Sequence, residues 1–160
     1  MDIFDYALQM EKDGESFYRE IAQKTSNEGL QKILTMLDDE EVKHYQVIER
    51  MKQDKYQMTE TTVLDDARNI FIKMKDQDET FEPDQEQAEL YLRAQEIEKK
   101  SQQFYQEKAG QTDKDDQKKL FERLAKEEEK HYFLLENIIA FVSRPKQWLE
   151  NAEWYHLEEY

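Results

Sequence analysis

Apolar side chains recur at helical spacing in four long segments of the chain. In the first segment, for example, Ile3, Ala7 and Met10 follow one another at intervals of four and three residues. Intervals of three, four and seven place such side chains along one face of an α-helix. The pattern therefore predicts four long helices, at about residues 2–25, 29–55, 84–109 and 114–143.

Turn-forming residues separate these segments in pairs. Ser26–Gly29 lies between the first and second segments, and Gly110–Asp113 lies between the third and fourth. Pro145 follows the fourth segment, and a proline cannot continue a helix. Short connections of this kind join antiparallel neighbours, so we predict two helical hairpins, at about residues 2–55 and 84–143.

The connection between the hairpins is long, at residues 56–83, and apolar spacing predicts a short helix near 63–75 within it. One long crossover between two hairpins is typical of ferritin-like folds. Residues 145–160 contain Trp148 and other apolar side chains, so we expect a short C-terminal helix packed on the bundle. The fold prediction is an all-α, ferritin-like four-helix bundle that forms a single domain over residues 1–160.

Composition supports this interpretation and excludes several functions. Only three Gly and two Pro occur, so strand-and-turn signals are few. The net charge of −15 argues against nucleic acid as a partner. The absence of cysteine excludes thiolate zinc sites, iron–sulfur clusters and rubredoxin-type iron sites in this chain. No apolar run approaches the roughly 18 residues of a membrane span, and the start of the chain lacks a signal-peptide pattern. We therefore expect a cytoplasmic protein.

The two hairpins repeat each other at an offset of 87 residues. Residues 2–51 and 89–138 share 16 identities in 50 aligned pairs. Core packing alone explains repeated apolar residues, but it does not explain repeated Glu and His. The repeated polar residues therefore indicate a shared chemical role.

Glutamate and histidine recur in this repeat at the spacing of metal ligands. A Glu and a His three residues apart lie on one helix face. Counted from the two turns, all four helices place their candidate ligands 14 to 16 residues away, and therefore in one layer. Four carboxylates offset the charge of two divalent ions, and one His for each ion favours iron or manganese. The predicted ligands are Glu11, Glu41, His44, Glu98, Glu128 and His131.

Two other glutamates and a third Glu-x-x-His motif also have the residue types of metal ligands. Glu40 and Glu127 also repeat, four residues before each His, and are alternative ligands in place of Glu41 and Glu128. The motif at Glu153–His156 has no counterpart 87 residues earlier and no companion glutamate. We interpret that motif as structural.

Glu11 and Glu98, each in the first helix of its hairpin, have small and aromatic residues on the same helix face. Gly14 and Ser101 lie three residues after these glutamates and leave room for a metal. Glycine inside a helix costs about 1 kcal/mol relative to alanine, so Gly14 indicates a steric reason. Tyr18 and Tyr105 lie seven residues after the glutamates. They are either core residues or hydroxyl donors that orient a ligand carboxylate.

The chain resembles the rubrerythrin branch of the ferritin-like superfamily. The resemblance rests on Glu11 with Phe17-Tyr18, Glu41–Tyr45, Glu98 with Phe104-Tyr105, and Glu128–Tyr132. It implies a di-iron site that Glu41 and Glu128 bridge. It also implies that Glu11 and Glu98 bind terminally and that His44 and His131 each ligate one iron. The chain departs from the family because it lacks the cysteines of a rubredoxin domain.

Three functions are compatible with these observations. The first is a peroxidase or ferroxidase in oxidative-stress defence, which would need an external electron donor and for which we expect a homodimer. The second is storage, buffering or delivery of iron. The third is a metal-free helical interaction module. The expected cofactor is a pair of iron ions, with manganese or a mixed pair as the alternative.

Overall fold

The computed structural model describes residues 2–77 and 85–150, which fold into α-helices and include no strand. This confirms the predicted all-α class. The helices of the described residues are α1 (Ile3–Lys24), α2 (Glu28–Lys52), α3 (Val63–Asp76), α4 (Gln85–Gln111), α5 (Asp115–Ser143) and α6 (Pro145–Glu150).

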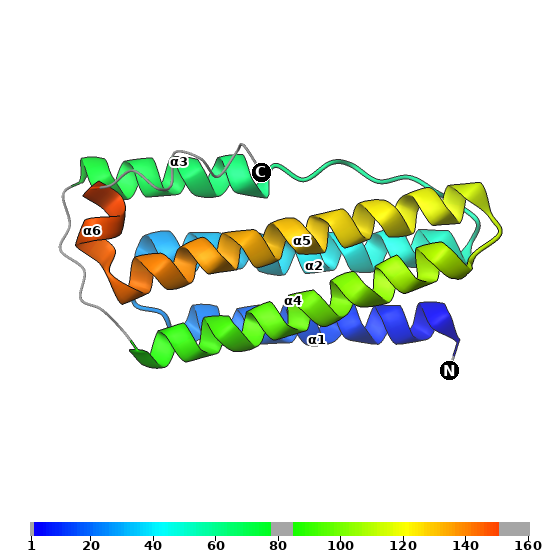
Figure 1. The fold of residues 1–160 in the computed structure, drawn as a ribbon, viewed down its shortest axis with the longest axis horizontal. Coiled ribbons are helices and arrows are strands. Elements are labelled where there is room, and N and C mark those ends of the chain that lie inside the picture. Colours follow the sequence, from blue (N-terminus) through cyan, green and yellow to red (C-terminus); the bar gives the residue numbers. More distant parts are fainter. Residues whose placement is uncertain (1, 78–84, 151–160) are drawn as a thin grey trace.

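The four long helices run along one another as two antiparallel hairpins, α1 with α2 and α4 with α5 (Figure 1). After α2 the chain runs back along the bundle to α3, which begins about half-way along it (Figure 1). Helix α3 packs on α2 and α5, and α6 packs on α5 and α3. The predicted ferritin-like bundle, with its long crossover and short C-terminal helix, is therefore confirmed.

Local signals explain where several of these helices begin. Asp2 caps α1, because its side chain accepts a hydrogen bond from the backbone N–H of Asp5 at 2.9 Å. Asn27 caps α2 in the same way. Such caps satisfy N–H groups that the helix itself leaves without partners. Pro145 occupies the first position of α6, where a proline is tolerated.

Two apolar clusters fill the bundle on either side of a polar layer. One cluster includes Leu37 and Leu134, and the other includes Val47 and Ala125. On α2 the buried polar residues lie between Leu37 and Val47, and on α5 they lie between Ala125 and Leu134. Apolar packing above and below thus excludes water from the layer that holds the predicted ligands.

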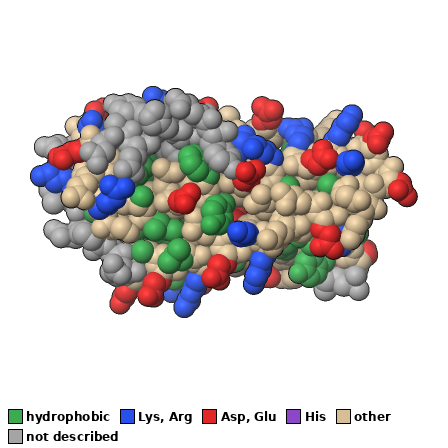
Figure 2. Space-filling view, in the orientation of Figure 1, with side chains coloured by type: hydrophobic (Ala, Val, Ile, Leu, Met, Phe, Trp, Pro, Cys, Tyr) green, Lys and Arg blue, Asp and Glu red, His purple; other side chains and the backbone are tan. Residues whose placement is uncertain are grey.

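On the described part of the face seen in Figure 2, acidic and basic side chains are scattered among hydrophobic ones, and no described histidine is visible. This agrees with the complete burial of His44 and His131. Among the described residues, no helix has an apolar stretch long enough to cross a membrane. The third motif, Glu153–His156, and the crossover segment 78–84 lie outside the described residues.

Candidate metal centre

The six predicted side chains meet in the polar layer, and each is at most 3% exposed. They form two groups of four whose ligand atoms lie within 4.8 Å of one another. One group is Glu11, Glu41, His44 and Glu128, and the other is Glu41, Glu98, Glu128 and His131. The two middle glutamates belong to both groups, as expected for carboxylates placed between two ions.

Several polar atoms of this cluster are buried and make no hydrogen bond within the described residues. They include both carboxylate oxygens of Glu128 and the Nδ1 atoms of His44 and His131. The Nδ1 atom of His44 lies 2.7 Å from Glu128 Oε1, yet the pair lacks hydrogen-bond geometry. Buried polar atoms in native proteins are nearly always satisfied. Buried carboxylate oxygens and imidazole nitrogens that lack hydrogen-bond partners are therefore expected where a site binds cations.

Gly14 provides the space that this arrangement needs. A Cβ atom at this position would lie 3.1 Å from Oε2 of Glu41 and 3.2 Å from its Cδ, closer than side chains usually pack. The glycine on α1 therefore allows the Glu41 carboxylate to lie against the backbone of a neighbouring helix. Ser101, its counterpart on α4, is also buried. The donor set, the unpaired atoms and this cradle together fit a pair of metal ions.

The tyrosines of each half contact the lone glutamate of the other half. Tyr18 donates a hydrogen bond to Glu98 Oε1 at 2.5 Å, and Tyr105 donates one to Glu11 Oε1 at 2.5 Å. Both rings are also buried in the apolar clusters. Burial, together with the nearby carboxylates, raises the pKa of both hydroxyls well above 10, so they stay protonated donors. Each tyrosine thus packs in the core and orients a carboxylate.

Comparison with known proteins assigns the family. The family model for rubrerythrin matches residues 2–139, which span α1 through most of α5 and contain all six predicted ligands. The chain belongs to the rubrerythrin family. No rubredoxin domain is indicated, in agreement with the absence of cysteine. Neither the curated proteins nor the solved structures gave a significant match.

In this rubrerythrin-family cluster, a glutamate of the opposite half lies behind each histidine, and one of the two, Glu127, forms a hydrogen bond with it. His44 Nε2 lies 2.7 Å from Glu127 Oε1, and His131 Nε2 lies 3.6 Å from Glu40 Oε1. In both rings Nε2 therefore points away from the cluster and Nδ1 points into it. Carboxylates in this position fix the tautomer and orientation of a ligating imidazole.

This supporting role of Glu40 and Glu127 was not recognised in the sequence. Their repetition was a signal, but it led only to their prediction as alternative ligands, whereas their contacts with histidine cross the bundle. Neither residue belongs to the two groups of four, which contain Glu41 and Glu128 instead. The geometry therefore favours Glu41 and Glu128 as ligands.

Electrostatics divides the carboxylates of the metal-free rubrerythrin-family cluster into two kinds. Burial raises the pKa of Glu41 and Glu128 well above 4.5, and the neighbouring glutamates raise it further. Burial acts in the same direction on Glu98, but the charge of His131, together with hydrogen bonds from Glu128, His131 and Tyr18, outweighs it and lowers the pKa of Glu98 to about 2. Burial disfavours the imidazolium of His131, but Glu98, Glu40 and Glu128 together stabilise it and raise its pKa to about 10. The two shared glutamates thus keep their protons to higher pH than a free carboxyl group does, whereas Glu98 and His131 form an ion pair.

Proposed function

We propose that this rubrerythrin-family protein holds two iron ions in its buried layer and reacts with peroxide or O₂ in oxidative-stress defence. The observation that carries the proposal is the duplicated cluster of four carboxylates and two imidazoles, whose buried atoms lack hydrogen-bond partners. Two divalent ions would neutralise the four carboxylates. Oxygen-rich ligation with one nitrogen for each ion suits iron, with manganese or a mixed pair as the alternative.

The position of each glutamate determines whether it would bind one ion or both. Glu41 and Glu128 would bridge the two ions, because both groups of four include them. Glu11 and Glu98 would each bind one ion terminally, in an orientation that the tyrosine hydroxyls hold. A bound ferrous pair supplies two electrons for the reduction of peroxide or O₂.

The surrounding residues prepare the layer for this chemistry. His44 and His131 would each give Nδ1 to one ion, since their Nε2 atoms face Glu127 and Glu40. The apolar clusters on either side keep bulk water away from the carboxylates. Electrostatic interactions are stronger in such a water-excluded site.

The partners are also proposals. Because the chain has no cysteine, it has no thiolate-bound iron of its own to supply electrons. We therefore propose that an external electron donor restores the ferrous state. We also propose a homodimer in the cytoplasm, which light scattering and cell fractionation would test.

Metal analysis followed by stopped-flow oxidation tests the function. Protein loaded anaerobically with ferrous iron should contain about two ions per chain, as the two groups of ligands require. The double variant His44→Ala/His131→Ala should lose them, while His156→Ala is the matched control. Equal, low metal content in all three proteins would refute the site.

The loaded protein is then mixed with peroxide or with O₂. Rapid oxidation by either one supports the oxidoreductase. Full binding without reaction with either would exclude the oxidoreductase and support iron buffering or delivery instead.

A further inference from the structure

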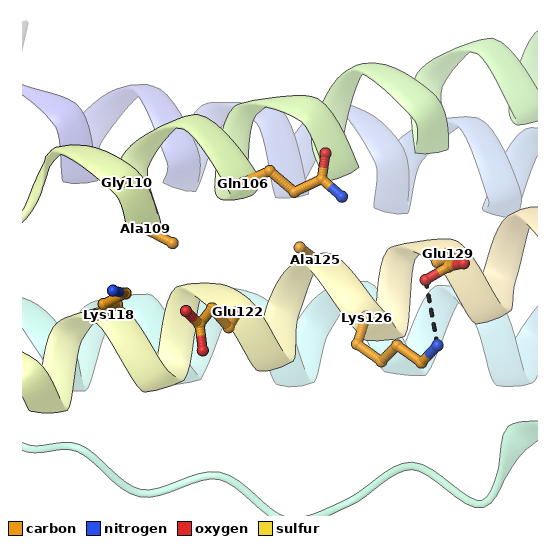
Figure 3. Close-up of a pocket in the computed structure, with 8 residues that line it drawn as sticks. All are labelled: Gln106, Ala109, Gly110, Lys118, Glu122, Ala125, Lys126 and Glu129. Atoms are coloured by element: carbon orange, nitrogen blue, oxygen red, sulfur yellow. Dashed lines mark hydrogen bonds and ion pairs between the residues drawn. The ribbon is translucent and has the colours of Figure 1, made fainter.

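Two surface cavities lie on the described part of the bundle, and only one of the two is lined by a residue that contacts a predicted ligand. The cavity between α4 and α5 has a volume of about 380 Å³ and is lined by charges of both signs (Figure 3). Among these, Lys126 lies 3.3 Å from Glu129. None of its lining residues is one of the six predicted ligands. Because its lining contains both lysines and glutamates, this cavity favours neither cations nor anions.

The second cavity is acidic and reaches the polar layer. It has a volume of about 180 Å³ and lies between α2 and the start of α3. Its lining includes the carboxylates of Asp39, Glu40 and Asp66 and no lysine or arginine. Carboxylate and hydroxyl oxygens are donors that hard divalent cations prefer. We call this cavity the acidic pocket.

Glu40 connects the acidic pocket to the metal centre. Its Oε1 atom accepts a hydrogen bond from the hydroxyl of Thr61, in the crossover, and lies 3.6 Å from Nε2 of His131. Its other oxygen lies 4.0 Å from the ammonium of Lys43. His131 is fully buried, and neither of its ring nitrogens makes a hydrogen bond in the described residues. An unpaired imidazole nitrogen thus faces the carboxylate at the bottom of the pocket.

The equivalent glutamate in the other half of the repeat, Glu127, is less exposed and already engaged. The side chain of Glu127 is 6% exposed and is held by His44 at 2.7 Å, whereas the side chain of Glu40 is 12% exposed. The residue that corresponds to Asp39 in this half is Lys126. A cation approaching Glu127 would therefore meet a positive charge and a carboxylate that is already engaged. The crossover, which occurs once in the chain, makes the two halves different.

We propose that divalent metal ions enter and leave the centre through the acidic pocket, and that Glu40 passes them to the position beside His131. The proposal rests on the proposed metal-binding function. Asp39 and Asp66 raise the local concentration of cations at the mouth. Release of Glu40 from Thr61 lets its carboxylate carry the ion inward. The ion bound by Glu98 and His131 therefore exchanges faster than the ion bound by Glu11 and His44.

The rate of metal loading tests this proposal without any oxidant. Cobalt(II) is mixed with the metal-free protein, and its binding is followed by visible absorption in a stopped-flow instrument. The double variant Asp39→Asn/Asp66→Asn should load about tenfold more slowly than the wild type, because it loses the local attraction. Its final content of metal should be unchanged. Glu122→Gln/Glu129→Gln, which removes two carboxylates from the α4–α5 cavity, is the matched control and should load at nearly the wild-type rate.

Thr61→Val should change the loading rate in the opposite direction to Asp39→Asn/Asp66→Asn. It removes the hydroxyl that holds Glu40, so loading should become faster, and a chelator should withdraw one of the two ions faster than from the wild type. Equal slowing in the mouth variant and its control would overturn the proposal, because bulk charge would then explain the rates. If wild-type protein bound no metal, the proposed function would fall as well. If it bound about two ions and every variant loaded at the same rate, only the entry route would be wrong.

Discussion

Metal binding to this centre should release protons, because we expect several glutamates and histidines of the metal-free cluster to be protonated. Burial and the neighbouring carboxylates raise the pKa of Glu41 and Glu128. We therefore expect both to hold a proton at neutral pH. Burial opposes the charging of His44 and His131, yet the surrounding glutamates raise the pKa of both. Metal ions bind ionised carboxylates and neutral imidazoles. All four groups must therefore lose a proton when two ions bind.

The expected magnitude follows from this count. About four protons should leave for each pair of ions, or about two for each ion. One pH unit changes the free energy by about 1.4 kcal/mol for each proton released. Near neutral pH, the affinity for each ion should therefore rise about 100-fold with each unit of increasing pH, or by about 2.7 kcal/mol.

Calorimetric titration in buffers of different ionisation enthalpy measures this proton release directly. Anaerobic ferrous iron or zinc is titrated into metal-free protein at pH 7. Glu41→Gln should lower the release to about three protons, because glutamine is neutral in both states. Glu122→Gln, on the surface, should leave it at about four. A wild-type release near zero would show that the reasoning about the protonated cluster is wrong.

Three further predictions concern single groups of the centre. Gly14→Ala should weaken metal binding, because its Cβ would press on the Glu41 carboxylate, but should change the unfolding free energy of metal-free protein by less than about 1 kcal/mol. Metal titration and denaturation in chelator measure the two effects. Tyr18→Phe should destabilise metal-free protein by about 1–3 kcal/mol through loss of the hydrogen bond to Glu98, and an unchanged urea midpoint would contradict this. The raised pKa of His131 stabilises metal-free protein below pH 6.5, and this contribution should disappear as pH rises towards 10. The lowered pKa of Glu98 stabilises it above pH 4.5, and that contribution should be lost as pH falls towards 2, as thermal denaturation across pH would show.

The sequence alone determined the helices through apolar periodicity, the hairpins through short turns, and the six predicted ligands through the 87-residue repeat. Helical periodicity assigns each residue to a face, and distance from a turn assigns it a depth along the bundle. Both are local properties of the chain, so they can be read without the fold. Glu41 and Glu128 were predicted in this way, and the structure includes both in each of the two groups of four buried side chains.

The partners of these residues across the bundle were decided only by the tertiary structure. Glu40 and Glu127 have the same spacing to histidine in the sequence, yet one is held by the crossover and the other by His44. The rotation of each helix, set by packing of the apolar clusters, determines which side chains face one another. The crossover then adds Thr61 to one half only. Spacing along a chain carries no information about such contacts, because they depend on how separate helices are placed against one another.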